Sequence, residues 1–232
     1  MEQAQNKINP VKHIGVIIDG NRRYAKARGM PTFIGHEKGA EKVEKFLDWA
    51  KELGIKEITA YILSTENLNR DKEELSHLFR IFRKFFDKLE KDKKVDENRV
   101  KIRFIGDLSL VPKDIKESAE KVEQKTKDYN NYIINFCFAY GGRQELISAF
   151  NKLANEGKTN ITESDITNSL WLSSEPEFII RTGGKTRSSN FLPWQSVYSE
   201  WFFLDKTWPE IEKGDLIDCM NKFQAIQRNF GK

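Results

Sequence analysis

The sequence predicts a single α/β domain in which helices cover both faces of a mainly parallel sheet. Short apolar runs alternate along the chain with segments whose apolar residues recur at helical spacing, as they do in βαβ units. The length of 232 residues suits one sizeable domain better than two, and no repeat or linker divides the chain. Residues 1–232 are therefore assigned to one domain, with residues 1–12 expected to be flexible.

The first strand and helix are the clearest elements of the pattern. Residues 14–18 are apolar and, apart from Gly15, β-branched, as is typical of a strand buried on both faces. Residues 22–27 then look helical, and Gly29 is a suitable stop for that helix.

The next elements follow from periodicity in the same way. Apolar residues at helical spacing predict one helix over residues 39–53, which stops at Gly54, and another over residues 72–91. Between these helices an apolar run predicts a strand over residues 57–63. Alternation of polar and apolar residues predicts a strand over residues 99–105.

The second half of the chain continues the alternation. A charged helix is expected over residues 114–127, then a buried strand over 132–139, which ends in a glycine-containing turn and opens a helix over 144–155. A short helix over 163–171, strands over 177–180 and 199–204, and a closing helix from 215 to about 229 complete the chain.

The helix over residues 72–91 has a stripe of aromatic residues on one face. Phe79, Phe82, Phe85 and Phe86 fall on this stripe. The stripe is either ordinary core packing or a wall along a long hydrophobic ligand, and the sequence leaves both interpretations open.

The turn after the first strand has the features of a phosphate site. Asp19 ends the strand, and Gly20 and Asn21 allow a tight turn into a helix that begins with Arg22 and Arg23. An anion there would meet unpaired N–H groups, the positive end of the helix dipole and two cations. A carboxylate would repel a phosphate directly, so its simplest use is to hold Mg²⁺ against it. The alternative is that Asp19 only caps the helix.

Three further polar groups are expected at the ends of strands, as Asp19 is, where ligands bind in open α/β folds: residues 64–70, residues 181–190 and Glu200, which begins the last strand. Residues 64–70 follow the second strand. Residues 181–190 follow the strand over 177–180 and place two arginines and several hydroxyls around a Gly-Gly turn, which suits a diphosphate. This segment lacks the Lys-Ser/Thr ending of a nucleotide-binding loop, so nucleotide hydrolysis is not indicated. His36 stands alone before a helix, where a histidine is more often structural.

Composition excludes some classes of partner. The chain has 39 Lys and Arg residues against 35 Asp and Glu, a net charge of +4, which indicates a solvated surface and no nucleic-acid partner. Cys137 and Cys219 have no metal-ligand spacing. No apolar run approaches the length of a membrane span. We expect a cytoplasmic protein, with peripheral contact as its closest association with a membrane.

Seven motifs together give the chain a family resemblance. They are HIGVIIDGNRRYAK, GHEKGAEKV, STENLNR, RFIGD, FAYGGRQEL, IIRTGGKTRSSNFLPWQSVYSEWFF and WPE, in this order from residue 13 almost to the end. With them the chain resembles the cis-prenyltransferases, the family of undecaprenyl diphosphate and dehydrodolichyl diphosphate synthases. The Arg22 variant of the first motif is similar to archaeal and eukaryotic members.

The resemblance implies a fold and a reaction. The implied fold has about six mostly parallel strands flanked by helices, a hydrophobic tunnel and usually a homodimer. The implied reaction is a Mg²⁺-dependent extension of an allylic diphosphate, such as farnesyl diphosphate, by isopentenyl diphosphate to give a cis-polyprenyl diphosphate.

The resemblance also implies roles for particular residues. Asp19 would direct Mg²⁺ with Glu200 as the second acidic partner, while Gly20, Asn21, Arg22 and Arg23 would bind the allylic diphosphate with His36 nearby. Arg181, Arg187 and Ser189 would bind isopentenyl diphosphate, and Ser64, Asn67 and Arg70 would surround the reacting carbons and the leaving group. Asp19, His36, Ser64 and Asn67 are the candidate catalytic residues.

Three positions modify this expectation. Members often carry an Arg before the Gly-His pair, whereas this chain has Thr32, so Arg22 or Arg28 has to supply that phosphate contact. Asn229 stands where members that complete a neighbour's active site have the Arg of an Arg-x-Gly sequence. Ile62 shares a strand face with Ser64, and its branched side chain would narrow a tunnel, which predicts a short or medium product.

Two other classes of function compete with this interpretation. A non-catalytic subunit of a heteromeric prenyltransferase would keep the fold, but it would lose the Asp-Gly-Asn and Arg-Thr-Gly-Gly sequences, which are intact here. An unrelated phosphate-binding α/β protein would have no reason to combine STENLNR with the aromatic helix.

Overall fold

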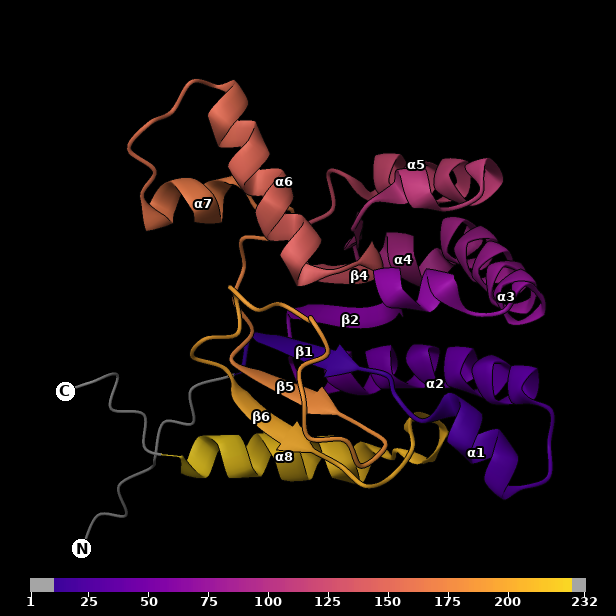
Figure 1. Ribbon diagram of the computed structural model, residues 1–232. Helices are drawn as coiled ribbons and strands as arrows, with labels where there is room; N and C mark the ends of the chain where they lie inside the picture. The colour runs from indigo at the N-terminus through magenta and orange to yellow at the C-terminus, as the bar shows by residue number, and fades with distance from the viewer. Residues whose placement is uncertain (1–10, 227–232) are drawn as a thin grey trace, which may run out of the picture.

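Six parallel strands form one sheet at the centre of the computed structural model, which describes residues 11–226 (Figure 1). The strand order is β3-β4-β2-β1-β5-β6, and every neighbouring pair is parallel. The strands are β1 (His13–Ile17), β2 (Glu57–Ser64), β3 (Val100–Ile105), β4 (Tyr132–Tyr140), β5 (Phe178–Arg181) and β6 (Glu200–Phe203). The predicted α/β fold with a parallel sheet is confirmed.

Eight α-helices connect and cover the strands within the described residues. They are α1 (Asn21–Ala27), α2 (Thr32–Glu52), α3 (Lys72–Lys91), α4 (Lys93–Glu97), α5 (Lys113–Thr126), α6 (Gly142–Asn155), α7 (Glu163–Ser169) and α8 (Lys213–Ala225). Short 3-10 helices lie at Thr65–Asn69, Leu108–Leu110 and Trp208–Glu210.

Alternate residues of the strands enter two different cores. Val16 and Ile180 belong to the larger core, which also contains buried residues of α2, α3, α5 and α8. Ile17 and Ile179 belong to a second core, in which their partners include Leu172, Phe191 and Leu192, outside the helices. The sheet is therefore buried on both faces, as the apolar strand sequences require.

Helix α2 begins earlier than its periodicity predicts. The prediction starts at Gly39, whereas the helix starts at Thr32 and places His36 on its first turns. The two helical glycines are sites of close approach: a Cβ on Gly35 would overlap the carbonyl oxygen of Asn21, and one on Gly39 would lie 2.6 Å from Asn21 Oδ1. Glycine at these positions lets α2 pack directly against the turn after β1.

The described residues begin with the segment that leads into β1. Val11 is buried, and the backbone N–H groups of Lys12 and His13 both donate to Glu177 Oε2 at 2.7 Å. The remainder of the stretch expected to be flexible, residues 1–10, lies outside the described residues, as does Asn229. Within residues 11–226 no helix is long and apolar enough to cross a membrane.

Candidate active site

Asp19 occupies a rigid position just beyond the carboxyl end of β1. Its backbone N–H donates to the carbonyl of Ile17 at 3.0 Å. Its own carbonyl accepts from Thr182 Oγ1 at 2.7 Å and from the Trp208 N–H at 3.0 Å. Three chain segments thus fix the backbone that carries the carboxylate.

The carboxylate of Asp19 lies between two arginines. Oδ2 accepts from Arg181 Nη2 at 2.9 Å, and Oδ1 accepts from Arg23 Nη2 at 3.0 Å. The N-cap of α1 is Gly20, and no side chain caps this helix, so the capping interpretation of Asp19 is wrong. Burial by itself would raise the pKa of Asp19, but the hydrogen bond from Arg181 and the charges of Arg23 and Arg181 hold that pKa below its ordinary value. Asp19 is therefore ionised at neutral pH.

Gly20 makes the turn possible. Its φ of 109° lies in the left-handed region, and a Cβ would lie 2.7 Å from Thr207 Cβ. Residues with side chains are excluded from the point where the chain passes from Asp19 into α1.

A cationic pocket of about 760 Å³ opens beside this turn. It contains the predicted allylic-diphosphate residues Gly20, Asn21, Arg22 and Arg23, together with Asp19, His36, Lys26, Arg70, Lys185 and Arg187. Six cations against one carboxylate make this a site for a strongly anionic ligand.

Arg22 and Arg28 were the two candidates to replace the family Arg where this chain has Thr32. Arg22 and Thr32 both line the cationic pocket. Arg28 instead donates to Glu210 Oε1 at 2.8 Å, and its guanidinium carbon lies 3.9 Å from the centroid of the Tyr24 ring. The geometry favours Arg22.

The segment after β5 forms a second cradle. Arg181 is 3% exposed, and its Nη1 donates to Ser189 Oγ at 2.6 Å and to the carbonyl of Arg187. The buried Nε of Arg181 has no partner among the described residues, nor does Oδ1 of Asn21. Unpaired polar atoms are costly inside a protein, so two of them at one site indicate that a ligand or water completes it.

A cavity of about 500 Å³ joins this second cradle to the first. Its lining includes Arg181, Arg187, Ser189, Asp19, Asn21, His36, Ser64, Asn67 and Arg70. Ser64 and Asn67 are held by each other: the Asn67 N–H donates to Ser64 Oγ at 3.1 Å, and the Ser64 N–H donates to Asn67 Oδ1 at 3.3 Å. This capping box begins the 3-10 helix and fixes both side chains at the cavity wall.

Glu74 links several site residues and is absent from the sequence-based candidates. It is a buried carboxylate whose Oε1 lies 3.1 Å from His36 Nε2 and 2.8 Å from Arg70 Nη1, and whose Oε2 lies 3.7 Å from Arg22 Nη1. Two signals could have found it: helical spacing of four from Arg70, and an N-cap at Asp71, whose side chain accepts from the Glu74 N–H.

His36 is a neutral wall of the site. Burial lowers its pKa, and the charge of Arg70 acts in the same direction, against the hydrogen bond to Glu74. His36 also lines the two cavities described above. The residue therefore has a structural contact, with Glu74, and also a place in the wall of the site.

Glu200 is the first residue of β6, whereas Asp19 follows the last residue of β1, so the two residues lie at opposite ends of the parallel strands. In the register of the sheet Glu200 pairs with Phe178, whereas Ile17 lies level with Arg181 and Phe203. Three residues of strand separate Glu200 from that end, which is about 10 Å at roughly 3.3 Å per residue. Within one chain, Asp19 and Glu200 therefore cannot bind the same metal ion, contrary to the expectation.

Apolar cavities continue from the cradles between α2 and α3. A cavity of about 50 Å³ shares Ile18, Ile62 and Leu78 with the larger one and is otherwise lined mainly by apolar residues. Phe82 and Phe85 line it, whereas Phe86 is fully buried against the rings of Phe104 and Phe138. The aromatic stripe thus contributes to the core, and two of its rings also line a cavity.

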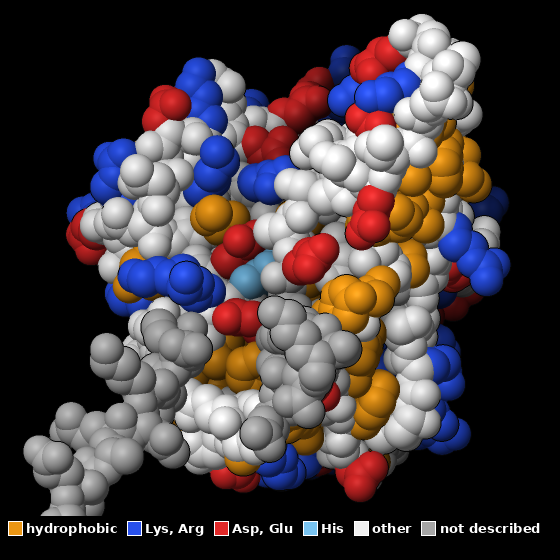
Figure 2. Space-filling view, turned by 90° about the vertical axis from the view of Figure 1, so that its left-hand side faces the viewer, with side chains coloured by type: hydrophobic (Ala, Val, Ile, Leu, Met, Phe, Trp, Pro, Cys, Tyr) orange, Lys and Arg blue, Asp and Glu red, His pale blue; other side chains and the backbone are white. Residues whose placement is uncertain are grey.

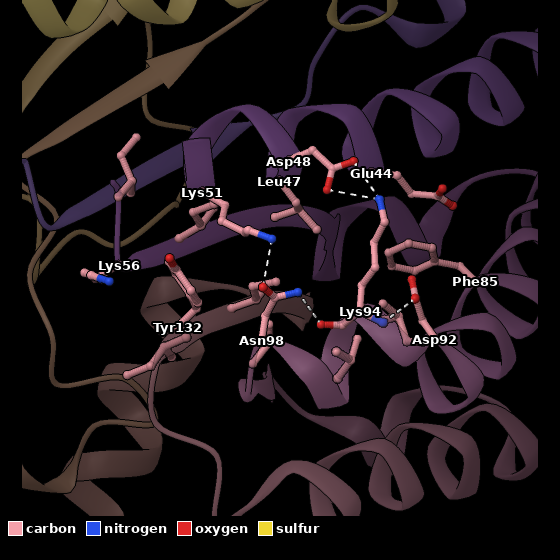
Figure 3. A pocket seen from close by; sticks show the side chains of 17 residues that line it. Glu44, Leu47, Asp48, Lys51, Lys56, Phe85, Asp92, Lys94, Asn98 and Tyr132 are labelled. Atoms are coloured by element: carbon pink, nitrogen blue, oxygen red, sulfur yellow. Dashed lines mark hydrogen bonds and ion pairs between the residues drawn. The ribbon is translucent and has the colours of Figure 1, made fainter. Parts of the chain in front are cut away.

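A last pocket of about 120 Å³ lies beyond Phe85 at the far end of this row. Figure 3 shows two contacts among its lining residues, one from α2 to α4 and one from α2 to Asn98, the residue that follows α4. Lys51 Nζ donates to Asn98 Oδ1 at 2.8 Å, and Lys94 Nζ lies 3.1 Å from Asp48 Oδ2. Buried apolar residues, among them Ile55, Ile58 and Phe85, form part of its lining, and the charged residues of the lining are half-buried or exposed.

Known proteins share this arrangement over the whole chain. The family model described as "Putative undecaprenyl diphosphate synthase" matches residues 17–231. A Thermoplasma volcanium protein named tritrans,polycis-undecaprenyl-diphosphate synthase (geranylgeranyl-diphosphate specific) is 41% identical over 240 residues, covering 100% of this chain and 93% of its own.

Two solved structures extend the similarity to three dimensions. Lavandulyl diphosphate synthase from Lavandula x intermedia, in complex with dimethylallyl diphosphate, has a TM-score of 0.90 and 30% identity, covering 96% of this chain and 99% of its own. The structure described as a probable undecaprenyl diphosphate synthase from Campylobacter jejuni has a TM-score of 0.82 and 30% identity, covering 97% of this chain and 100% of its own.

Proposed function

Because this chain belongs to the cis-prenyltransferase family, we propose that it condenses isopentenyl diphosphate with an allylic prenyl diphosphate. One observation carries the proposal: two cationic cradles meet at Asp19, and a row of apolar cavities leads away from them. Two diphosphate substrates need two cationic sites, and a growing hydrocarbon needs an apolar channel.

Geranylgeranyl diphosphate is the primer that the relatives favour. Several archaeal relatives at about 40% identity are named as geranylgeranyl-diphosphate specific. We propose this primer in place of the farnesyl diphosphate expected from the sequence, and a product of undecaprenyl length.

In the proposed reaction the allylic C1–O bond breaks, inorganic diphosphate leaves, and a new bond joins allylic C1 to C4 of isopentenyl diphosphate as C2 loses a proton. Negative charge grows on the departing diphosphate, where Arg22, Arg23 and the N–H groups at the start of α1 are already in place. Arg181 and Ser189 would hold the second substrate, and the fixed pair of Ser64 and Asn67 lines the space between the cradles.

Mg²⁺ is part of this proposal. Among the described residues no group of three or more His, Cys, Asp or Glu side chains could hold a metal ion. The donor set nevertheless fits Mg²⁺, which commonly uses one or two carboxylates and completes its shell with water and substrate phosphates. Asp19 is the ionised carboxylate that would hold it, and the ion would supply charge neutralisation on the diphosphate.

A homodimer is proposed from the surface. Figure 2 shows hydrophobic side chains gathered in a band along one side of the face drawn. Exposed apolar side chains include Ile147 and Phe150 of α6, Val197, and Phe203 of the edge strand β6. Patches of this kind and unpaired strand edges favour self-association, here with a second copy of the chain.

Incorporation of radiolabelled isopentenyl diphosphate tests the proposed function. The purified protein should form butanol-extractable product with geranylgeranyl diphosphate, more slowly with farnesyl diphosphate, and not after chelation of Mg²⁺ by EDTA. Size-exclusion chromatography with light scattering should give twice the chain mass. A protein that binds both diphosphates but makes no product with any primer would be a non-catalytic subunit, and the proposal would fail.

A further inference from the structure

Asn190 connects the loop of the second cradle to the turn that holds Ser64 and Asn67, and it lies in the wall of the cavity that joins the two cradles. We propose that Asn190 is a positioning residue, which holds the loop containing Arg187 and Ser189 in register with the turn containing Ser64 and Asn67. The inference rests on the proposed function, because it assigns isopentenyl diphosphate to that loop.

The hydrogen bonds of Asn190 reach two neighbouring segments. Its Oδ1 accepts from the Arg143 N–H at 2.9 Å, and its carbonyl accepts from the Gly142 N–H at 2.8 Å, so the residue is tied to the start of α6. Its Nδ2 donates to Glu66 Oε1 at 3.1 Å and to Gln144 Oε1 at 3.3 Å. Both polar ends of the amide are therefore used.

The Glu66 contact reaches the other half of the site. Glu66 lies in the 3-10 helix at Thr65–Asn69, between Ser64 and Asn67 of the capping box. Hydrogen bonds, among them the one from Asn190, outweigh burial and lower the pKa of Glu66. An ionised carboxylate thus accepts the amide hydrogen of Asn190, and the bond is charge-assisted.

The loop itself has a conformation that needs external support. Ser189 and Asn190 have φ values of 52° and 64°, in the left-handed region that residues other than glycine adopt at a cost. Arg181 holds one side of the loop through Ser189 Oγ. Asn190 holds the other side, and asparagine is among the residues that tolerate this backbone best.

Gly141 shows that the contact requires close approach. A Cβ there would overlap Gln144 Oε1 and lie 2.9 Å from both Asn190 Nδ2 and Thr65 Oγ1, so a side chain at residue 141 would press against the amide and its neighbours. The first glycine of the sequence Gly141-Gly142 therefore leaves room for the side chains of Gln144, Asn190 and Thr65 together.

Exchange of donor and acceptor tests the inference. Asn190→Asp keeps the acceptor for Arg143 and the tolerance for a left-handed backbone, but it places a carboxylate against Glu66. We expect KM for isopentenyl diphosphate to rise about tenfold or more, since small misplacements of binding groups have effects of this size. KM for the allylic primer should change by less than about twofold. Glu66→Gln alone should change this KM less than Asn190→Asp does, because its amide oxygen still accepts from Asn190.

The double variant Asn190→Asp/Glu66→Gln carries the decisive prediction. The new amide at position 66 can donate to the new carboxylate at position 190, which restores the bond with its direction reversed, so KM should return to within about threefold of wild type. Asn151→Asp on the exposed side of α6 is the matched charge control. Asn190→Gly, which keeps the backbone conformation and removes all three side-chain bonds, should also raise KM for isopentenyl diphosphate.

Two results would overturn the inference. One is unchanged kinetics in Asn190→Asp and Asn190→Gly; the other is a defect in Asn190→Asp that Glu66→Gln does not relieve. Thermal melting followed by circular dichroism checks each variant, and a melting curve that shifts with no change in KM would assign Asn190 to stability alone. Failure of the proposed function is distinct, because wild type itself would then make no product.

Discussion

Arg181 Nη2 lies 2.9 Å from Asp19 Oδ2, so the last residue of β5 is paired with a carboxylate just beyond β1. The two strands are neighbours in the sheet, and Ile17 lies level with Arg181. The arginine is buried and the carboxylate is partly buried. Asp19 lines both cavities, and Arg181 lines the cavity that joins the two cradles. Removal of either side chain leaves the charge of the other unpaired and poorly solvated.

Asp19→Ala should lower turnover by about 10²–10³-fold, as loss of one preorganised electrostatic group typically does. Steady-state incorporation of isopentenyl diphosphate measures the effect, and circular dichroism should show a folded protein. Asp19→Asn, which retains hydrogen-bonding capacity without the charge, should be nearly as defective. Normal turnover in either variant would remove Asp19 from the chemistry.

Gly39→Ala should raise KM for the allylic primer and destabilise the protein by about 1–3 kcal/mol, because the new Cβ would lie 2.6 Å from Asn21 Oδ1. Gly214→Ala is the matched control: this glycine is also helical, and a Cβ there meets no atom within 4 Å. Urea denaturation and initial rates on both variants check the prediction. Equal behaviour of the two variants would contradict the close approach of α2.

Ile62→Ala should lengthen the product. Ile62 lines both the substrate cavity and the apolar cavity that follows it, so a smaller side chain widens the passage between them. Thin-layer chromatography of the dephosphorylated products gives the length distribution. An unchanged distribution would reject Ile62 as a determinant of length.

Unfolding free energy should fall between pH 7.5 and pH 5.5, in part because of His36. Burial lowers the pKa of His36 from 6.5 in the folded protein, so the unfolded chain takes up the proton first and stability is lost as pH falls below 6.5. His36→Asn should show a smaller loss over this interval. The residual slope includes His13, whose pKa burial also lowers, and His77→Asn serves as the partly exposed control.

Asn229→Arg should lower KM for isopentenyl diphosphate more than KM for the primer. The family resemblance implies that an Arg at this position grips that diphosphate across the dimer, with a bidentate charged contact that an amide cannot supply. Asn229 lies outside the described residues, so kinetics with each substrate varied in turn are the direct check. If the wild-type protein were inactive alone and gained activity with a second subunit, the homodimer proposal would fail.

The strands and the site turns were predictable because their signals are local. Asp19, with Gly20 after it, is marked by the end of an apolar run and the start of a helix, and Arg181 by the end of a second apolar run, before a Gly-Gly turn. Such signals place residues at one edge of a parallel sheet without any knowledge of packing. The sequence could therefore indicate that two cationic turns meet.

Glu74, Glu200 and the start of α2 depended on tertiary structure. Glu74 sits in an ordinary charged helix turn, and only the approach of α2 makes it a partner of His36. Glu200 resembles the other acidic residues near strands, but it is the first residue of its strand. Because the strands are parallel, it lies at their amino-terminal ends, away from Asp19. The glycines of α2 reduce helix propensity, and only the neighbouring Asn21 shows why they are there.

The packing of Gly39 against Asn21 has a mechanical consequence. Helix α2 forms one wall of the apolar row through Val43, and the same helix supports the turn that we propose to bind the allylic diphosphate. A long product that forced α2 outward would withdraw that support from Asn21 at the same moment. Strain from accommodating the hydrocarbon chain of the product would thus reach the site of its diphosphate group. The longest products would weaken their own binding to the protein.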